Sequence, residues 1–402
     1  MIKKSSFFKE SHVNLNKFNN NLKRTQRVFI DLKFDIQNCK IPLLQSFKKN
    51  YLQDFSYSTI KKFSKYKNII IIGMGGSALG AKSIYNFFKK EIKKDVFFFD
   101  NLDENLYLEF KKLKKIKSSC FIIISKSGET IESITNLNIL FSNFSLKNKL
   151  VFITEIKDSS MVNIANKLNA EIIEHKNFIG GRYSVLSEAG MFPAALMGLN
   201  VKKFKVLDKL IIDKNFISSL IQNVAYIFTL NSQGLKNSII LNYDSNLKDL
   251  SYWYQQLVSE SLGKKGKGIT TIIAETPKDH HSTMQLYLDG PKDKFFTFFN
   301  SENKKNNLKL SGDVIQNNIK FLKNKKLRFI VNAQSKAVKN IFKIKKISFR
   351  QISFNKKNEE ELGTIFTFFV LETLLLARLM NVNPFNQPAV EQIKVETKKI
   401  LT

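Results

Sequence analysis

The chain has few cysteines and no long apolar run. Only two cysteines occur among its 402 residues, Cys39 in a polar segment and Cys120 at the start of an apolar run. Two isolated thiols give neither a disulfide framework nor a metal-ligand pattern, which fits a cytoplasmic location. Since no stretch of about 18 uninterrupted apolar residues is present, we predict no membrane-spanning helix. The N-terminal sequence has lysines but no apolar run behind them, so we predict no signal peptide.

Acidic residues are scarce relative to basic ones. The 65 Lys and Arg residues outnumber the 34 Asp and Glu residues, and the formal net charge is +31. Such a charge would suit an anionic partner, which includes nucleic acid, a membrane surface or a phosphorylated metabolite. The lysines are spread along the whole chain, and Asn, Ile and Phe are abundant too. Compositional bias therefore explains the charge more simply, and we predict no nucleic-acid or membrane partner.

The composition is otherwise that of a globular protein, with 43% apolar and 12% aromatic residues. The length allows two or three domains. No linker rich in Pro, Gly or Ser divides the chain, so its parts are expected to pack tightly. The predicted divisions are a helical N-terminal arm at 1–60, a first domain at 61–200, a second domain at 201–385 and a C-terminal helix at 386–402.

Continuous apolar runs alternate with helical patterns in both halves of the chain. Such runs are typical of buried parallel strands, and their alternation with helices predicts an α/β fold with two doubly wound parallel sheets. The expected strands are 68–72, 96–99, 120–124 and 150–153 in the first half, and 238–241, 270–273, 295–299 and 328–331 in the second. Residues 359–380 predict a long helix, and the segment 302–325, rich in Lys and Asn, predicts an exposed excursion.

The first candidate site is a glycine cluster, Gly73–Gly80, directly after a predicted strand. Glycines let the backbone turn sharply and approach a ligand, and the following helix directs free N–H groups at an anion. Gly76 and Ser77 lie at this turn. The cluster also resembles a dinucleotide fingerprint with Ala78 at the third glycine, and Asp100 stands where a ribose-binding acid would. A nicotinamide enzyme and a ligand-free turn are both alternatives at this motif.

A second cluster, Ser125–Thr130, follows the strand predicted at 120–124. Its three hydroxyls and the ammonium of Lys126 suit a phosphate, because hydroxyls supply adaptable hydrogen bonds and the lysine supplies charge. Carboxyl ends of strands are where open α/β sheets bind ligands. An N-capped helix would explain Ser127 or Thr130 alone, but two such loops on neighbouring strands favour a phosphate site.

The third cluster, Gly180–Gly190, pairs two glycines with Arg182. The arginine can place a permanent cation beside an anionic intermediate. On its own this segment would be interpreted as a surface turn with a solvated arginine.

With three later segments, these clusters resemble the glucose-6-phosphate isomerase family, in the family's order and from residue 73 to the C-terminus. The later segments are Gln255–Lys264, His281–Leu286 and Gln387–Lys394. The length and short tail are similar to the compact bacterial members. The resemblance implies two sugar isomerase domains, no metal or organic cofactor, and a homodimer with a shared active site.

The resemblance also implies roles for individual residues. Glu260 matches the catalytic base, and Arg182 matches the residue beside the enediolate. His281, from the neighbouring subunit, and Lys394 match the groups associated with ring opening. The matching substrate-binding positions are Gly76, Ser77, Ser125, Lys126, Ser127 and Thr130, which surround the phosphate, and Gln387.

These roles make chemical sense for aldose–ketose isomerisation. A carboxylate such as Glu260 can move a proton between C2 and C1, and Arg182 can stabilise the cis-enediolate oxygen. A histidine suits proton transfer during ring opening, although His280 is nearly as plausible as His281 from the sequence. The sequence departs from the family at Ser282–Met284 and at Leu262, where the family has an aromatic pair and an asparagine. These departures put the substrate range in doubt more than the reaction.

Two alternatives stay close to this family. One is a dual phosphoglucose/phosphomannose isomerase. The other is a non-catalytic phosphosugar-binding regulator, which would need the phosphate site but not Glu260, Arg182 and His281 together. The basic helical segment before residue 60 shows no helix-turn-helix spacing, which argues against a DNA-binding regulator.

Overall fold

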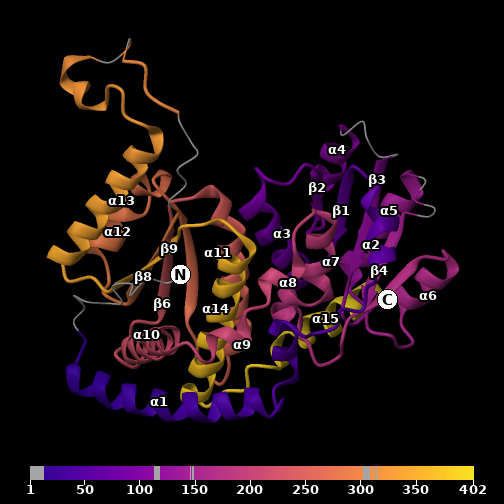
Figure 1. Cartoon of the computed structure of the whole chain (residues 1–402), viewed down its shortest axis with the longest axis horizontal. Helices are drawn as coiled ribbons and strands as arrows, with labels where there is room; N and C mark the ends of the chain where they lie inside the picture. The colour runs from indigo at the N-terminus through magenta and orange to yellow at the C-terminus, as the bar shows by residue number, and fades with distance from the viewer. Residues whose placement is uncertain are drawn as a thin grey trace.

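The structure is a computed structural model that describes residues 13–112, 118–144, 146, 149–301, 308–312, 314 and 316–402. The N-terminal segment, for which we predict no signal peptide, lies almost wholly outside these residues. So does part of the excursion expected at 302–325. Figure 1 shows two sheets side by side, each with helices packed against it.

The first sheet has five parallel strands in the order β2-β1-β3-β4-β5. They are β1 (Asn68–Ile72), β2 (Asp95–Phe99), β3 (Ser119–Ile124), β4 (Leu150–Thr154) and β5 (Glu171–Glu174). The four strands expected in this half are confirmed. The short edge strand β5 was not predicted, because its two isoleucines are flanked by glutamates and form no apolar run. The predicted fold class is confirmed by this order, which is that of a doubly wound sheet.

The second sheet has four parallel strands in the order β7-β6-β8-β9. They are β6 (Asn237–Asn242), β7 (Thr270–Glu275), β8 (Lys294–Ser301) and β9 (Phe349–Phe354). Three predicted strands are confirmed, but the strand expected at 328–331 is wrong. That segment begins the helix α13 (Leu327–Ile344). Its inward residues recur at helical spacing, with Val331, Ser335, Val338 and Phe342 facing the sheet.

The helices surround and join the two sheets. They are α1 (Leu15–Gln37), α2 (Tyr57–Ser64), α3 (Gly76–Phe88), α4 (Glu104–Lys112), α5 (Ile131–Asn143), α6 (Ser160–Lys167), α7 (Glu188–Leu196), α8 (Val201–Phe204), α9 (Leu207–Leu210), α10 (Lys214–Ser232), α11 (Lys248–Leu262), α12 (Met284–Asp289), α13, α14 (Glu359–Met380) and α15 (Pro388–Leu401).

One apolar core runs through both halves of the chain. It includes β1, β6 and the facing sides of α3, α11 and α14. Trp253 of α11 is fully buried and packs edge-on against Phe366 of α14, with ring centroids 4.8 Å apart. Helix α14 has the length and composition of a membrane span, but 89% of that window is buried inside the protein. It is therefore the central helix of a protein core, and the helix predicted at 359–380 is confirmed.

The N-terminal helices connect the two halves. Helix α1 packs along α10 and α14 (Figure 1). Its Phe18 stacks on Tyr226 with ring centroids 4.1 Å apart. Helix α2 packs instead on α7 beside the first sheet, where Phe63 meets Phe192. The helical arm predicted for this region thus braces both sheets, while the three boundaries between the four predicted divisions stay predictions.

Candidate functional site

The candidate site begins at the carboxyl ends of β1 and β3, where the order of the first sheet reverses. The two strands pair in parallel, so the loops that follow them start about 5 Å apart. The loop after β1 leads into α3, and the loop after β3 leads into α5. Helix N-termini direct free N–H groups outward, and such a reversal in an open α/β sheet is where ligands bind.

The glycine loop lies against the segment that carries Arg182. Gly75 has φ +51°, which favours glycine, and Gly76 begins α3. A Cβ on Gly76 would lie 2.2 Å from the carbonyl carbon of Gly181, so only glycine allows the two backbones to approach this closely. Ser184 Oγ donates to Gly181 O at 2.8 Å and braces the contact. The glycine loop and the segment that carries Arg182, about a hundred residues apart in the sequence, therefore lie against each other and form one side of the candidate site.

The hydroxyl cluster after β3 has the chemistry of a phosphate cradle. Ser125 Oγ and Thr130 Oγ1 lie 2.7 Å apart. Thr130 precedes α5, yet its side chain makes no capping hydrogen bond, so N-capping does not explain the residue. Ser127 Oγ accepts the N–H of Glu129 at 3.2 Å, and Lys126 Nζ lies 3.6 Å from Glu155. Four of the predicted phosphate-binding residues thus lie together beside the N-terminus of α3, which carries Ser77.

Arg182 joins three distant parts of the chain. Its side chain is only 2% exposed. Nη1 donates to Glu260 Oε2 at 3.0 Å and to Gln387 Oε1 at 2.8 Å. Nε donates to Ser261 Oγ at 2.9 Å, and Nη2 donates to Pro384 O. The alternative of a solvated surface arginine is therefore wrong, since the guanidinium is buried and fixed on every side.

Glu260 stands in the last turn of α11 with both carboxylate oxygens engaged. Oε2 faces Arg182, and Oε1 accepts Gln256 Nε2 at 2.7 Å. The side chain is 26% exposed, so a small substrate can reach it. A Cβ on Gly75 would lie 2.8 Å from Gln256 Nε2, which places this amide between the glycine loop and the carboxylate. The environment suits a base with a fixed orientation.

Gln256 is a candidate site residue that the sequence did not single out. It precedes Glu260 by four positions, so the two side chains share one face of a helix. The neighbouring Gln255 turns away and donates to Thr271 O at 2.7 Å. The spacing of four residues from Glu260 could have indicated Gln256. Choosing it also required knowing which face of α11 lies toward the glycine loop.

Lys264 belongs to a segment that resembles the family, but the resemblance implies no role for it. Its Nζ donates to the carbonyl oxygens of Glu260 and Ser261, at 2.6 and 2.9 Å. It therefore caps the C-terminal end of α11. Burial, together with the nearby charge of Arg182, lowers the pKa of Lys264 to about 8.

His281 and Lys394 lie apart from this cluster. His281 is exposed and follows the carboxyl end of β7, whereas Gln255 contacts the start of that strand. At about 3.3 Å per residue, the strand separates His281 from the end of α11 by more than 10 Å. Lys394 is exposed on α15 and pairs with Glu391 at 2.7 Å. Within the described part of the chain, no hydrogen bond or ion pair joins either residue to Arg182 or Glu260.

The structure distinguishes the two adjacent histidines. His280 Nε2 lies 2.8 Å from the hydroxyl of Tyr243, and burial lowers the pKa of His280. His281, in contrast, is exposed. Of the two, His281 is the one free to meet another molecule.

Comparison with known proteins identifies relatives over most of the chain. The phosphoglucose isomerase family profile matches residues 45–290. A glucose-6-phosphate isomerase from Methanocaldococcus jannaschii is 30% identical over 86% of this chain and 87% of its own. Another, from Mycoplasmopsis synoviae, is 32% identical over 82% of this chain and 81% of its own.

Solved structures share the fold at lower identity. A hypothetical protein from Thermus thermophilus superposes with a TM-score of 0.78 at 21% identity, covering 96% of this chain and 94% of its own. A glucose-6-phosphate isomerase from Chlamydia trachomatis superposes with a TM-score of 0.77 at 16% identity, covering 98% and 87%. At these identities the structures support the fold and its two-sheet arrangement.

Proposed function

We propose that Glu260 and Arg182 carry the reaction of this chain, which belongs to the phosphoglucose isomerase family. The reaction interconverts glucose 6-phosphate and fructose 6-phosphate. The observation that supports the assignment is the contact between their side chains beside the phosphate cradle. A carboxylate and a buried guanidinium at 3.0 Å are the two groups that proton transfer through an enediolate requires. A regulator that only bound the sugar phosphate would need neither.

In this mechanism the substrate phosphate binds at the hydroxyl cluster and the N-terminus of α3. Ser77, Ser125, Ser127 and Thr130 donate hydrogen bonds to it, and Lys126 supplies charge. Binding energy from this distant group orients C1 and C2 at Glu260. Gln387 and Arg182 then contact the sugar oxygens, because their side chains are hydrogen-bonded to each other next to Glu260.

The proton transfer needs one base and one cation. Glu260 removes the proton from C2 of the aldose and returns it to C1, and the C1 carbonyl oxygen takes up a proton as the C2 hydroxyl loses one. Arg182 stabilises the negative charge on the enediolate oxygens between the two steps. Gln256 holds the Glu260 carboxylate in a fixed orientation through Oε1.

Ring opening is assigned to a second subunit. His281 is exposed and lies far from Glu260 along the same chain, so we assign it to the active site of the partner in a homodimer. Lys394 is assigned to the same step. We expect this dimer to be cytoplasmic and to need no metal or organic cofactor.

Turnover by the purified chain tests this function. Fructose 6-phosphate should be converted to glucose 6-phosphate without added metal or nucleotide, and mannose 6-phosphate should react at least about a hundredfold more slowly. Comparable rates with both aldoses would favour the dual phosphoglucose/phosphomannose isomerase. Binding of fructose 6-phosphate without turnover would favour the non-catalytic regulator.

A further inference from the structure

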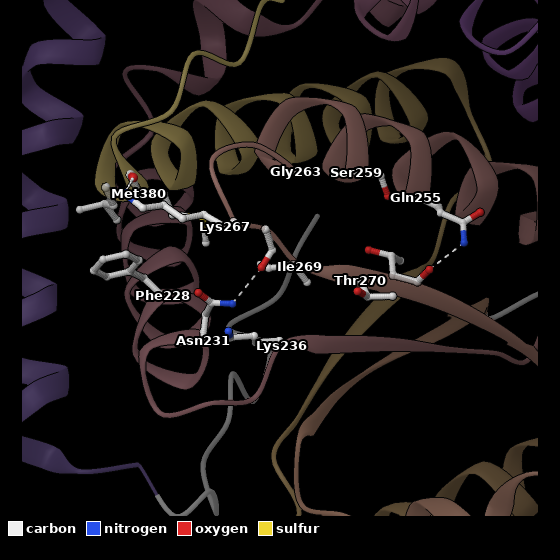
Figure 2. Close-up of a pocket in the computed structure, with 14 residues that line it drawn as sticks. Phe228, Asn231, Lys236, Gln255, Ser259, Gly263, Lys267, Ile269, Thr270 and Met380 are labelled. Atoms are coloured by element: carbon white, nitrogen blue, oxygen red, sulfur yellow. Dashed lines mark hydrogen bonds between the residues drawn. The ribbon is translucent and has the colours of Figure 1, made fainter. Parts of the chain in front are cut away.

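A cavity of about 790 Å³ lies on the side of α11 that faces away from the glycine loop. Figure 2 shows it between the end of α11, the start of β7 and the C-terminal ends of α10 and α14. Cavities of this volume accommodate small metabolites. It belongs to the amino-terminal edge of the second sheet, whereas the phosphate cradle lies at the carboxyl edge of the first sheet.

The charged groups that line this cavity are cationic among the residues that the structure describes. They are Lys236 and Lys267, with no aspartate or glutamate in that part of the lining. Thr270 N–H donates to Lys236 O at 2.9 Å. This hydrogen bond holds the backbone of Lys236 next to Thr270, which is only a few residues from Lys267. Lys267 Nζ donates to Met380 O at 2.8 Å and keeps two further N–H groups for a ligand. The two ammonium groups therefore favour an anion at this end of the cavity.

The remaining wall has both an apolar and a hydroxyl component. Phe228, Leu379 and Met380 supply an apolar surface. Ser259 and Thr270 are exposed and supply hydroxyl groups, which can donate hydrogen bonds to a ligand oxygen.

We propose that this cavity is a second binding site, which takes a small phosphorylated metabolite with an apolar part. The phosphate contacts Lys236 and Lys267, an oxygen accepts from Thr270, and the apolar part lies on Phe228 and Met380. A metabolite bound here leaves the sugar-phosphate site free, because α11 separates the two. On α11, every fourth residue from Gln255 lines the cavity, namely Gln255, Ser259 and Gly263. Gln256 and Glu260 lie on the adjacent face of the same helix, toward Arg182.

The test is to count phosphate sites by isothermal titration calorimetry on the full chain at about 0.15 M salt, where exposed charges are screened. Phenyl phosphate is the probe, because it combines a phosphate with an apolar ring. Benzyl alcohol is its uncharged counterpart, and inorganic phosphate lacks the ring. To isolate the second site, the titrations use the Ser125→Ala/Ser127→Ala variant, whose phosphate cradle is weakened.

In that background we expect one phenyl phosphate per chain, with weaker binding of inorganic phosphate and none of benzyl alcohol. Lys236→Ala and Lys267→Ala should each weaken phenyl phosphate binding about tenfold, or about 1.4 kcal/mol. Lys236 is exposed and makes no side-chain hydrogen bond within the described residues, so this variant should fold normally. Thr270→Val removes an exposed hydroxyl from the lining and should weaken phenyl phosphate binding.

The matched control is Lys214→Ala, which removes the same charge from the far end of α10 and should leave binding unchanged. Equal weakening by Lys214→Ala would mean that net charge alone attracts the probe, and would overturn the proposal. Unchanged binding in both Lys236→Ala and Lys267→Ala would also overturn the proposal. The same holds if the Ser125→Ala/Ser127→Ala variant no longer binds phenyl phosphate at all. Isomerase activity is measured separately, so failure of this site leaves the catalytic assignment standing.

Discussion

The carboxylate of Glu260 and the guanidinium of Arg182 lie 3.0 Å apart, although 78 positions separate the two residues in the chain. The guanidinium is buried and also bound to Ser261, Pro384 and Gln387, so it cannot turn away when a substrate enters. A cation fixed in advance stabilises developing negative charge without reorganising during the reaction. The same contact holds the proposed base, Glu260, in place beside the proposed cation, Arg182.

The contact between Gly76 and Gly181 should tolerate no side chain. In Gly76→Ala the new Cβ would lie 2.2 Å from backbone, so we expect a loss of about 3 kcal/mol in the free energy of unfolding and at least tenfold in kcat/KM. Thermal denaturation and fructose 6-phosphate turnover measure the two effects. Gly180→Ala is the matched control, since its Cβ would meet only the Tyr183 ring at 3.5 Å. Wild-type behaviour of Gly76→Ala would contradict the close approach.

Gln256 should act through the orientation of Glu260. Gln256→Leu keeps a side chain of similar size but removes the hydrogen bond to Oε1, so kcat should fall roughly 10- to 100-fold. KM for fructose 6-phosphate should change little, because the residue lies outside the phosphate cradle. Gln222→Leu makes the same exchange on the exposed side of α10 and should keep both constants. A rise in KM with unchanged kcat would show that Gln256 binds substrate instead.

Lys264 should make the stability of the protein depend on alkaline pH. Its pKa is about 8 in the folded protein against an ordinary value of 10.5, so between these values the unfolded chain binds more protons than the folded one. The free energy of unfolding gains a contribution as pH rises from about 8 to 10.5, and below pH 8 the burial penalty is fully present. Denaturant titrations at both pH values should show a smaller increase for Lys264→Met than for wild type. The exposed Lys265→Met serves as the control, and an equal increase in all three proteins would refute the lowered pKa.

The assignment of His281 to the partner subunit predicts complementation. Glu260→Gln and His281→Ala should each be nearly inactive alone. After denaturation and refolding as an equal mixture, half of the dimers should be mixed, with one complete site of two, so about a quarter of wild-type activity should return. If the mixture stays inactive while co-purification through a tag on only one of the two variants shows mixed dimers, His281 acts within its own subunit or not at all.

The sheets were largely predictable because buried parallel strands are continuous apolar runs. β1, with its four isoleucines, and β3 could be recognised from the residues alone. One exception was β5 in the first sheet, whose two isoleucines are flanked by glutamates. The other was in the second sheet, where Phe329–Val331 offered such a run but belongs to a helix. The true fourth strand, β9, contains Arg350 and Gln351, and Arg350 is buried against Glu372. A buried charged residue in a strand, paired here with Glu372 of α14, interrupts the apolar run by which the strand would be recognised.

The candidate site was predictable where its residues are contiguous. The cluster at 125–130 has in one segment the hydroxyls and the lysine from which a phosphate site is proposed, and the structure brings the hydroxyls of Ser125 and Thr130 together. The contacts of Arg182 with Glu260 and Gln387 depend on the packing of three distant segments, so spacing in the sequence could not supply them. Gln256 and Gln255 are equivalent in the sequence, and only the orientation of α11 separates the residue that holds Glu260 from the one that faces β7.

The most direct measurement is fructose 6-phosphate isomerisation in deuterium oxide by wild type and by Glu260→Gln, with binding of the sugar phosphate measured in parallel. The amide keeps the size of the carboxylate but cannot accept the proton. We predict that the variant still binds fructose 6-phosphate, that kcat falls about a thousandfold, and that deuterium uptake at C1 and C2 falls with it. Wild-type turnover and deuterium uptake in Glu260→Gln would show that another group is the base, and would contradict the central assignment.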